Sequence, residues 1–227
     1  MSTSGRRGRR WLLAMVAVAG VLIASRVDAI SGPHNFQGTA PAGAVCIACH
    51  TPHKAPASPL LWNHVLSANN FSWSDWVATT GNTTLPTNIK TWSGSTKMCL
   101  SCHDGSVAIG AIYFPSAVFD LEKITDDHQM ATTTGDLKGN HPVAVPYPHG
   151  GVKNTYNGIT TGDEALASGW VAAPARVKLY RDAAGGGANN YGIECASCHE
   201  PHSTSPHGNY LRDSKAGSAL CLDCHVK

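Results

Sequence analysis

Residues 195–202 read CASCHEPH, and residues 46–53 read CIACHTPH. In each stretch a pair of cysteines is followed at once by a histidine, and a second histidine comes three residues later, after a proline. Two further stretches, 99–103 (CLSCH) and 221–225 (CLDCH), repeat the C-x-x-C-H pattern. The four motifs use all eight cysteines of the chain, so one chemistry must explain every cysteine.

C-x-x-C-H is the attachment signature of c-type haem, in which both thiols bond to the porphyrin and the histidine binds the iron. On a helical turn, positions i, i+3 and i+4 project from one side, so all three groups can hold one cofactor. The sequence therefore predicts four c-type haems. The expected thioether residues are Cys46, Cys49, Cys99, Cys102, Cys195, Cys198, Cys221 and Cys224. The expected proximal iron ligands are His50, His103, His199 and His225.

Two other uses of paired cysteines have to be weighed against haem. Structural zinc sites contain C-x-x-C pairs, and secreted chains join even numbers of cysteines in disulfides. The four pairs are separated by 49, 92 and 22 residues, mostly outside the usual zinc-ribbon interval. A histidine also follows every pair, which neither alternative requires. Haem attachment therefore remains the favoured interpretation.

The N-terminus has the pattern of a secretory signal peptide. Four arginines precede an apolar stretch at 11–24, and Val27-Asp28-Ala29 offers a cleavage site with small residues. We expect residues 1–29 to be a signal peptide and residues 30–227 to form the tetrahaem cytochrome domain. The alternative is a retained membrane anchor, although the apolar stretch is shorter than the roughly 20 residues that a bilayer requires.

Cleavage changes the charge of the chain. The full sequence has 17 Lys and Arg against 15 Asp and Glu, and residues 1–29 contain five arginines and one aspartate. The mature chain therefore has 12 basic and 14 acidic residues. Haem propionates would make it more acidic still. This balance argues against a nucleic-acid partner, and no membrane span is expected after cleavage.

Size and composition predict the fold class. About 198 mature residues must accommodate four haems, which is too few for an ordinary protein core around each one. Gly and Pro together number 36, which favours turns and loops. We expect a multihaem cytochrome c that is mostly coil, with short α-helices at the motifs, minimal strand and the haem stack as its core. Ser218 is the expected N-cap of the last motif helix. The flanks of the two CxxCHxPH stretches do not repeat, so the sequence indicates at most a faint duplication.

The distal iron ligands have to come from the remaining histidines, because the mature chain has only Met98 and Met130 as alternatives. Five candidates compete for four positions: His53, His64, His141, His202 and His34. Pro52 and Pro201 stop the helical turn, so the histidine that follows each proline is free to point toward an adjacent haem. His128, His149 and His207 lie in polar or Gly/Pro-rich loops and are disfavoured. Which candidate serves which iron stays open.

At SGPHNF, CIACHTPH, PLLWNH, CLSCHDGSVA, NHPV, CASCHEPH and LCLDCH the chain resembles the filament-forming extracellular tetrahaem c-type cytochromes, the OmcE-like nanowire family. The resemblance implies a continuous stack of bis-histidine haems in protomers that polymerise head to tail outside the cell. It also implies that a histidine of a neighbouring protomer binds one iron. His53 is the first candidate for this role and His34 the second.

The expected function is electron transfer rather than enzymatic catalysis. Its partners would be other copies of the chain, upstream redox proteins and extracellular acceptors such as metal oxides. The expected location is an extracellular or cell-surface filament, with the periplasm as the alternative. A soluble periplasmic tetrahaem shuttle is the second hypothesis. A haem enzyme with one open iron is the third.

Overall fold

The computed structural model describes residues 32–36, 45–55, 59–74, 94–114, 121–160, 169–181, 190–203 and 207–226. The expected signal peptide, residues 1–29, lies outside these ranges. Within them, no helix is long and apolar enough to cross a bilayer. Turns and irregular backbone make up most of this part of the chain, as expected for a fold that is mainly coil.

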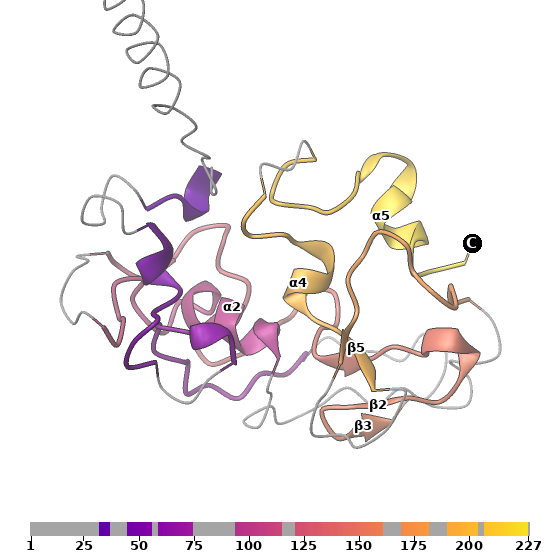
Figure 1. The fold of residues 1–227 in the computed structure, drawn as a ribbon, viewed down its shortest axis with the longest axis horizontal. Coiled ribbons are helices and arrows are strands. Elements are labelled where there is room, and N and C mark those ends of the chain that lie inside the picture. The colour runs from indigo at the N-terminus through magenta and orange to yellow at the C-terminus, as the bar shows by residue number, and fades with distance from the viewer. Residues whose placement is uncertain are drawn as a thin grey trace, which may run out of the picture.

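The regular elements are short (Figure 1). The α-helices are α2 (Ser95–His103), α4 (Cys195–Cys198) and α5 (Ala219–Leu222). The 3-10 helices are η1 (Gly32–His34), η2 (Val45–Ala48), η3 (Pro59–Leu61), η4 (His149–Gly151) and η5 (Ala216–Ser218). The strands are β1 (Val145–Pro146), β2 (Thr155–Tyr156), β3 (Ile159–Thr160), β4 (Tyr180–Arg181) and β5 (Tyr191–Ile193).

Every motif lies on a helical turn, as the spacing of its residues predicts. In the first, third and fourth motifs the histidine N–H donates to the carbonyl of the first cysteine, at 2.7, 3.1 and 2.9 Å. The second motif forms the end of α2. Ser218 is the N-cap residue of α5, as predicted, but it has a φ of 62° and its side chain makes no capping hydrogen bond.

The strands form a small antiparallel sheet of order β1-β5-β4, in which Gly192 of β5 lies opposite Pro146 and Tyr180. A separate hairpin joins β2 to β3 through Asn157 and Gly158, both with positive φ, as a two-residue hairpin turn requires. Only Glu194 separates the end of β5 from the start of α4, so the sheet fixes the start of the third motif.

The chain has an apolar core of its own, which the sequence did not lead us to expect. Its buried members come from segments far apart in the sequence: Phe71, Trp73, Leu100, Ala131, Leu137, Ala144, Val145, Tyr147 and Ile193. Leu100 lies inside the second motif, and Cys224 of the fourth motif packs against the cluster. Tyr147 is fully buried and donates its hydroxyl to the carbonyls of Val171 and Cys224. This core therefore holds the motif turns in place.

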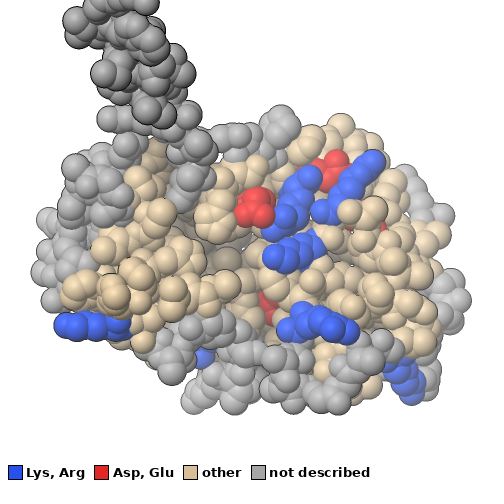
Figure 2. Space-filling model, in the orientation of Figure 1, with Lys and Arg blue, Asp and Glu red and all other residues tan. Residues whose placement is uncertain are grey.

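Charged side chains of both signs occur together on the surface. Figure 2 shows Lys and Arg gathered over the half of this face that carries α4 and α5, with acidic residues among them. Arg176 pairs with Asp213 at 2.7 Å, and Arg212 pairs with Glu200 at 2.9 Å.

Candidate haem sites

Three of the four proximal histidines face one of the predicted distal candidates. The ring centres of His50 and His202 lie 6.1 Å apart, as do those of His103 and His34. The fourth motif repeats the arrangement, since its proximal histidine, His225, lies 6.2 Å from His141.

These separations fit two imidazoles on one iron. Because a metal–imidazole bond is about 2.0–2.1 Å long and the ring centre lies about 1.1 Å behind the bonding nitrogen, two such ligands have centres about 6.3 Å apart. The planes of the two rings make an angle of 28° in the His50–His202 pair, 65° in the His103–His34 pair and 61° in the His225–His141 pair. The three pairs therefore have the separation that two histidines holding one haem iron would have.

In three of the proximal histidines and two of the distal candidates, the ring nitrogen Nδ1 is held by a hydrogen bond. Nδ1 of His50, His103 and His199 lies 2.8, 2.7 and 2.7 Å from the backbone carbonyls of Leu60, His128 and Asn209, respectively. Among the distal candidates, Nδ1 of His141 lies 2.8 Å from the Pro142 carbonyl, and Nδ1 of His202 lies 3.2 Å from the Glu200 carboxylate. A carbonyl or carboxylate partner keeps the proton on Nδ1 and leaves the lone pair of Nε2 for iron.

Two of the paired histidines are also held in the neutral form that a metal ligand needs. Burial, followed by the nearby His103, lowers the pKa of His34 below its ordinary value, despite a hydrogen bond to the Pro201 backbone. Burial and the nearby His141 lower the pKa of His225. Each imidazole therefore stays neutral over a wider range of pH.

The two remaining candidates are placed differently. His64 is almost fully buried, with its Nδ1 2.8 Å from the Val65 carbonyl and its Nε2 2.9 Å from the Ala108 carbonyl. Its Nε2 thus faces a hydrogen-bond acceptor, not a partner imidazole. His53 is exposed. The other three proximal histidines each face a second histidine ring, but among the described residues none faces the ring of His199.

Cysteines of successive motifs lie next to one another. Burial raises the pKa of Cys102 to about 12, and the next largest cause is the charge of Cys49 in the first motif. The thiol of Cys99 is hydrogen-bonded to that of Cys195 in the third motif, which is the largest cause of its raised pKa. Cys198 has a pKa raised by burial and then by neighbouring cysteines, among them one of the fourth motif. Cysteines of the first and second, the second and third, and the third and fourth motifs are therefore close enough to affect one another's pKa.

The first and third motifs are parts of one structural repeat, which corrects the expectation of a faint duplication. In both, Nδ1 of the proximal histidine lies within hydrogen-bond distance of the backbone carbonyl ten residues later in the sequence. The backbone N–H of the residue after that histidine donates to the carbonyl that is again ten residues further on, Leu61 for Thr51 and Tyr210 for Glu200. The second cysteine carbonyl then accepts from Asn63 in one repeat and from Arg212 in the other. The side chains of these two residues also make equivalent hydrogen bonds. Asn63 donates to the backbone carbonyl of Ile47 and Arg212 to that of Ala196, and each acceptor is the residue that follows the first cysteine of its motif. Residues 46–63 and 195–212 thus align without a gap.

The repeat keeps a costly backbone conformation. Leu60 and Leu61 have φ of 64° and 54°, and Asn209 and Tyr210 at the same positions have 47° and 57°. Left-handed backbone costs roughly 1–2 kcal/mol per non-glycine residue. These turns aim the carbonyls of Leu60 and Asn209 at the histidine rings, which is the type of site where such strain is retained.

The fourth motif is closed by a similar bridge from an earlier segment. His225 pairs with Trp170 in an antiparallel bridge, as His50 pairs with Trp62. In both cases the N–H after the histidine donates to the residue before the tryptophan. In three of the four motifs, backbone hydrogen bonds therefore hold the peptide groups on both sides of the proximal histidine.

The described cysteines form neither a disulfide bond nor a cluster of zinc-ligating side chains. All eight cysteines are free thiols. Within the described part of the chain, no group of three or more His, Cys, Asp or Glu side chains is arranged to hold a metal ion by itself.

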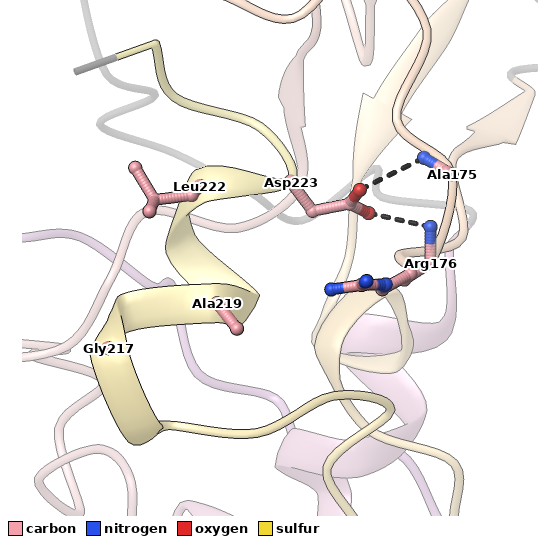
Figure 3. A pocket seen from close by; sticks show the side chains of 6 residues that line it. All are labelled: Ala175, Arg176, Gly217, Ala219, Leu222 and Asp223. Atoms are coloured by element: carbon pink, nitrogen blue, oxygen red, sulfur yellow. Dashed lines mark hydrogen bonds between the residues drawn. The ribbon is translucent and has the colours of Figure 1, made fainter.

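Asp223, inside the fourth motif, fixes that motif to the segment before β4. Its carboxylate accepts backbone hydrogen bonds from Ala175 at 3.0 Å and from Arg176 and Val177 at 2.7 Å each. Figure 3 shows this carboxylate turned toward the first two of these amides beside a shallow pocket. Burial works to raise the pKa of Asp223, but the three amides outweigh it and lower that pKa below its ordinary value.

The variant Asp223→Asn is expected to unfold at lower urea concentration than the wild type at pH 7. A carboxylate with a lowered pKa stabilises the fold above its unfolded pKa of about 3.9, and this contribution is lost as the pH falls through the folded value. Urea unfolding of the haem-loaded protein between pH 7 and pH 3 should show the difference shrinking below about pH 4. Asp127→Asn, at an exposed position, should match the wild type. An Asp223→Asn midpoint equal to that of the wild type at pH 7 would contradict this role.

Several residues at these sites were not singled out from the sequence. Glu200 binds the distal His202, and Asn63 closes the first repeat. Glu194 lies buried before the third motif. Their partners are far away in the sequence or depend on a particular turn, so composition and motif spacing carry no signal for them.

Comparison with known proteins gives a partial match. The whole chain matches no curated protein. Residues 188–227, which contain the third and fourth motifs, match the family model described as the doubled CXXCH motif, Paired_CXXCH_1. The matched motif is the attachment pattern of c-type haem, so the match supports covalent haem attachment at the third and fourth motifs and, with the two further CxxCH stretches, suggests a multihaem c-type cytochrome.

Proposed function

We propose that the chain carries four c-type haems and that its copies join head to tail into an extracellular filament that conducts electrons. The observation that carries the proposal is that three proximal histidines each face a second histidine at 6.1–6.2 Å, and the mutual influence of cysteines in neighbouring motifs supports it. Each haem would supply an iron that changes between ferric and ferrous. Attachment points that lie close together in successive motifs would give electrons a continuous path through the protein.

Paired axial histidines favour a carrier over an enzyme. His202, His34 and His141 each stand opposite a proximal histidine, which leaves no coordination position for a substrate at those three irons. Bis-histidine ligation also favours lower reduction potentials than histidine–methionine ligation does. Rings fixed by Nδ1 hydrogen bonds need little rearrangement when the charge on the metal changes.

The repeat supports a contact between copies. His202 in the second repeat stands opposite His50 of the first, and His53 occupies the position of His202 in the first repeat. By the same geometry, His53 would stand opposite His199. His53 is exposed, and we assign it to His199 of the next copy. His34 is already placed opposite His103 in its own chain, so it is the weaker candidate, and His64 is the surplus one. A head-to-tail contact that does not close into a ring gives a fibre.

The second candidate function is catalysis at one open iron, because His199 lacks a facing histidine within the described part of its own chain. A copy that did not polymerise would keep this position free for a small ligand. A soluble periplasmic shuttle is the corresponding interpretation for a monomer in which all four irons have two ligands.

Haem-loaded protein should contain four irons per chain and form filaments in negative-stain images. His53→Ala should give single protomers, and one iron in four should show a high-spin ferric signal. His207→Ala is the control and should leave the filaments intact. Wild-type material made only of single protomers with four low-spin irons would favour the shuttle. Single wild-type protomers with one high-spin iron that binds carbon monoxide or nitrite would favour the enzyme.

A further inference from the structure

Glu194 joins three segments through one buried carboxylate. The residue is fully buried and directly precedes the first cysteine of the third motif. Its Oε2 accepts from the N–H of Thr96 at 2.8 Å, and its Oε1 accepts from the hydroxyl of Tyr156 at 2.6 Å. It also accepts from the N–H of Ser197, whose hydroxyl in turn accepts from the N–H of Glu194 at 2.9 Å. A single side chain thus connects α2, β2 and α4.

The carboxylate caps two motif helices at once. Thr96 is the second residue of α2 and Ser197 the third residue of α4, and N–H groups at these positions have no acceptor within their own helix. Gly94, the N-cap residue of α2, offers no side chain for this purpose, so the cap comes from a residue 98 positions away. A negative charge at the start of α2 is also favoured by the helix dipole.

Two glycines allow this close arrangement. A Cβ added to Gly94 would lie 1.9 Å from Oε1 of Glu194, and one added to Gly192 would lie 2.3 Å from the ring of Tyr156. No side chain at either position could be accommodated without displacing the carboxylate or its tyrosine partner.

The same residues bring the second and third attachment points together. The hydroxyl of Thr96 accepts from the N–H of Cys195 at 3.0 Å, and the thiols of Cys99 and Cys195 are hydrogen-bonded. After this bond, burial and the charge of Cys195, the charge of Glu194 is the next cause that raises the pKa of Cys99. The carboxylate therefore acts on both attachment points, geometrically and electrostatically.

We propose that Glu194 is a positioning residue for electron transfer between the second and third motifs and that its buried negative charge lowers the reduction potentials of the irons held there. The proposal rests on the function proposed above. A negative charge in a medium of low dielectric constant favours the oxidised iron, which carries one more positive charge than the reduced iron. Charge and burial near a haem are among the means by which a protein sets its potential.

The test is a spectroelectrochemical titration of the haem-loaded protein. Glu194→Gln keeps the shape of the side chain and removes its charge, so two of the four midpoint potentials should rise while the other two stay at their wild-type values. Glu194→Asp keeps the charge and should retain wild-type potentials to a greater extent than the glutamine variant. Glu122→Gln removes an exposed carboxylate and should shift none of the four.

Unchanged potentials in fully loaded Glu194→Gln would overturn the proposal, and so would an equal shift of all four. If the glutamine variant does not load haem, the variant Tyr156→Phe tests the proposal instead. It removes one donor to the carboxylate and should change the same two potentials and no others, so four wild-type potentials in Tyr156→Phe would also overturn the proposal. A wild-type protein without four reversible haem transitions would instead overturn the proposed function itself, whatever Glu194 does.

Discussion

Replacement of His202 by methionine should raise one of the four reduction potentials by on the order of a few tenths of a volt. Axial ligands set haem potentials over a range of about 0.8 V, and methionine opposite histidine gives a higher potential than a second histidine. Only the iron of the first motif should respond, because His202 faces His50 at 6.1 Å. Potentiometry with visible spectra should show one transition moved upward and three unchanged.

The loop that carries His202 provides the control for this substitution. His207 lies five residues further on, so His207→Met introduces the same side chain into the same loop and should leave all four potentials unchanged. His202→Ala should instead leave the iron of the first motif with His50 as its single protein ligand and give a high-spin signal. If all three variants retain four wild-type transitions, the pairing of His202 with His50 is wrong.

Replacement of Asn63 by alanine should strongly destabilise the haem-loaded protein. The side chain is fully buried, and its Nδ2 donates to the carbonyls of Ile47 and Phe114 at 2.6 Å each. Its Oδ1 accepts from the N–H of Phe114 at 3.0 Å. Each buried group left without a partner costs about 1–3 kcal/mol, so we expect a loss of about 3–5 kcal/mol in the free energy of unfolding.

Urea unfolding followed by haem absorbance measures this loss directly. Asn70→Ala, at an exposed position, should stay close to the wild type. The equivalent change in the second repeat, Arg212→Ala, should also destabilise the protein, because Arg212 makes the matching bond to Ala196 and an ion pair with Glu200. An Asn63→Ala variant as stable as Asn70→Ala would contradict the role of this side chain in closing the repeat.

The attachment sites could be predicted from the sequence because their chemistry is local. Two thiols and an imidazole at positions i, i+3 and i+4 need only one helical turn to converge, and the structure has that turn at all four motifs. The abundance of coil followed from the size and composition of the chain. The apolar cluster around Tyr147 did not, because its members lie in short segments with no clear periodicity.

The distal partners and the order of the motifs were decided by the tertiary structure. His34 and His103 are 69 residues apart and His50 and His202 are 152 apart, and no local pattern relates such positions. The repeat is hidden in the sequence because its register is kept by backbone hydrogen bonds, which tolerate different side chains at most positions. Sequence alone thus determined the prediction of what the chain binds and through which atoms, since covalent attachment depends on spacing within one turn. Which imidazole stands opposite which iron ligand depended on long-range packing, since only the folded chain brings those segments together.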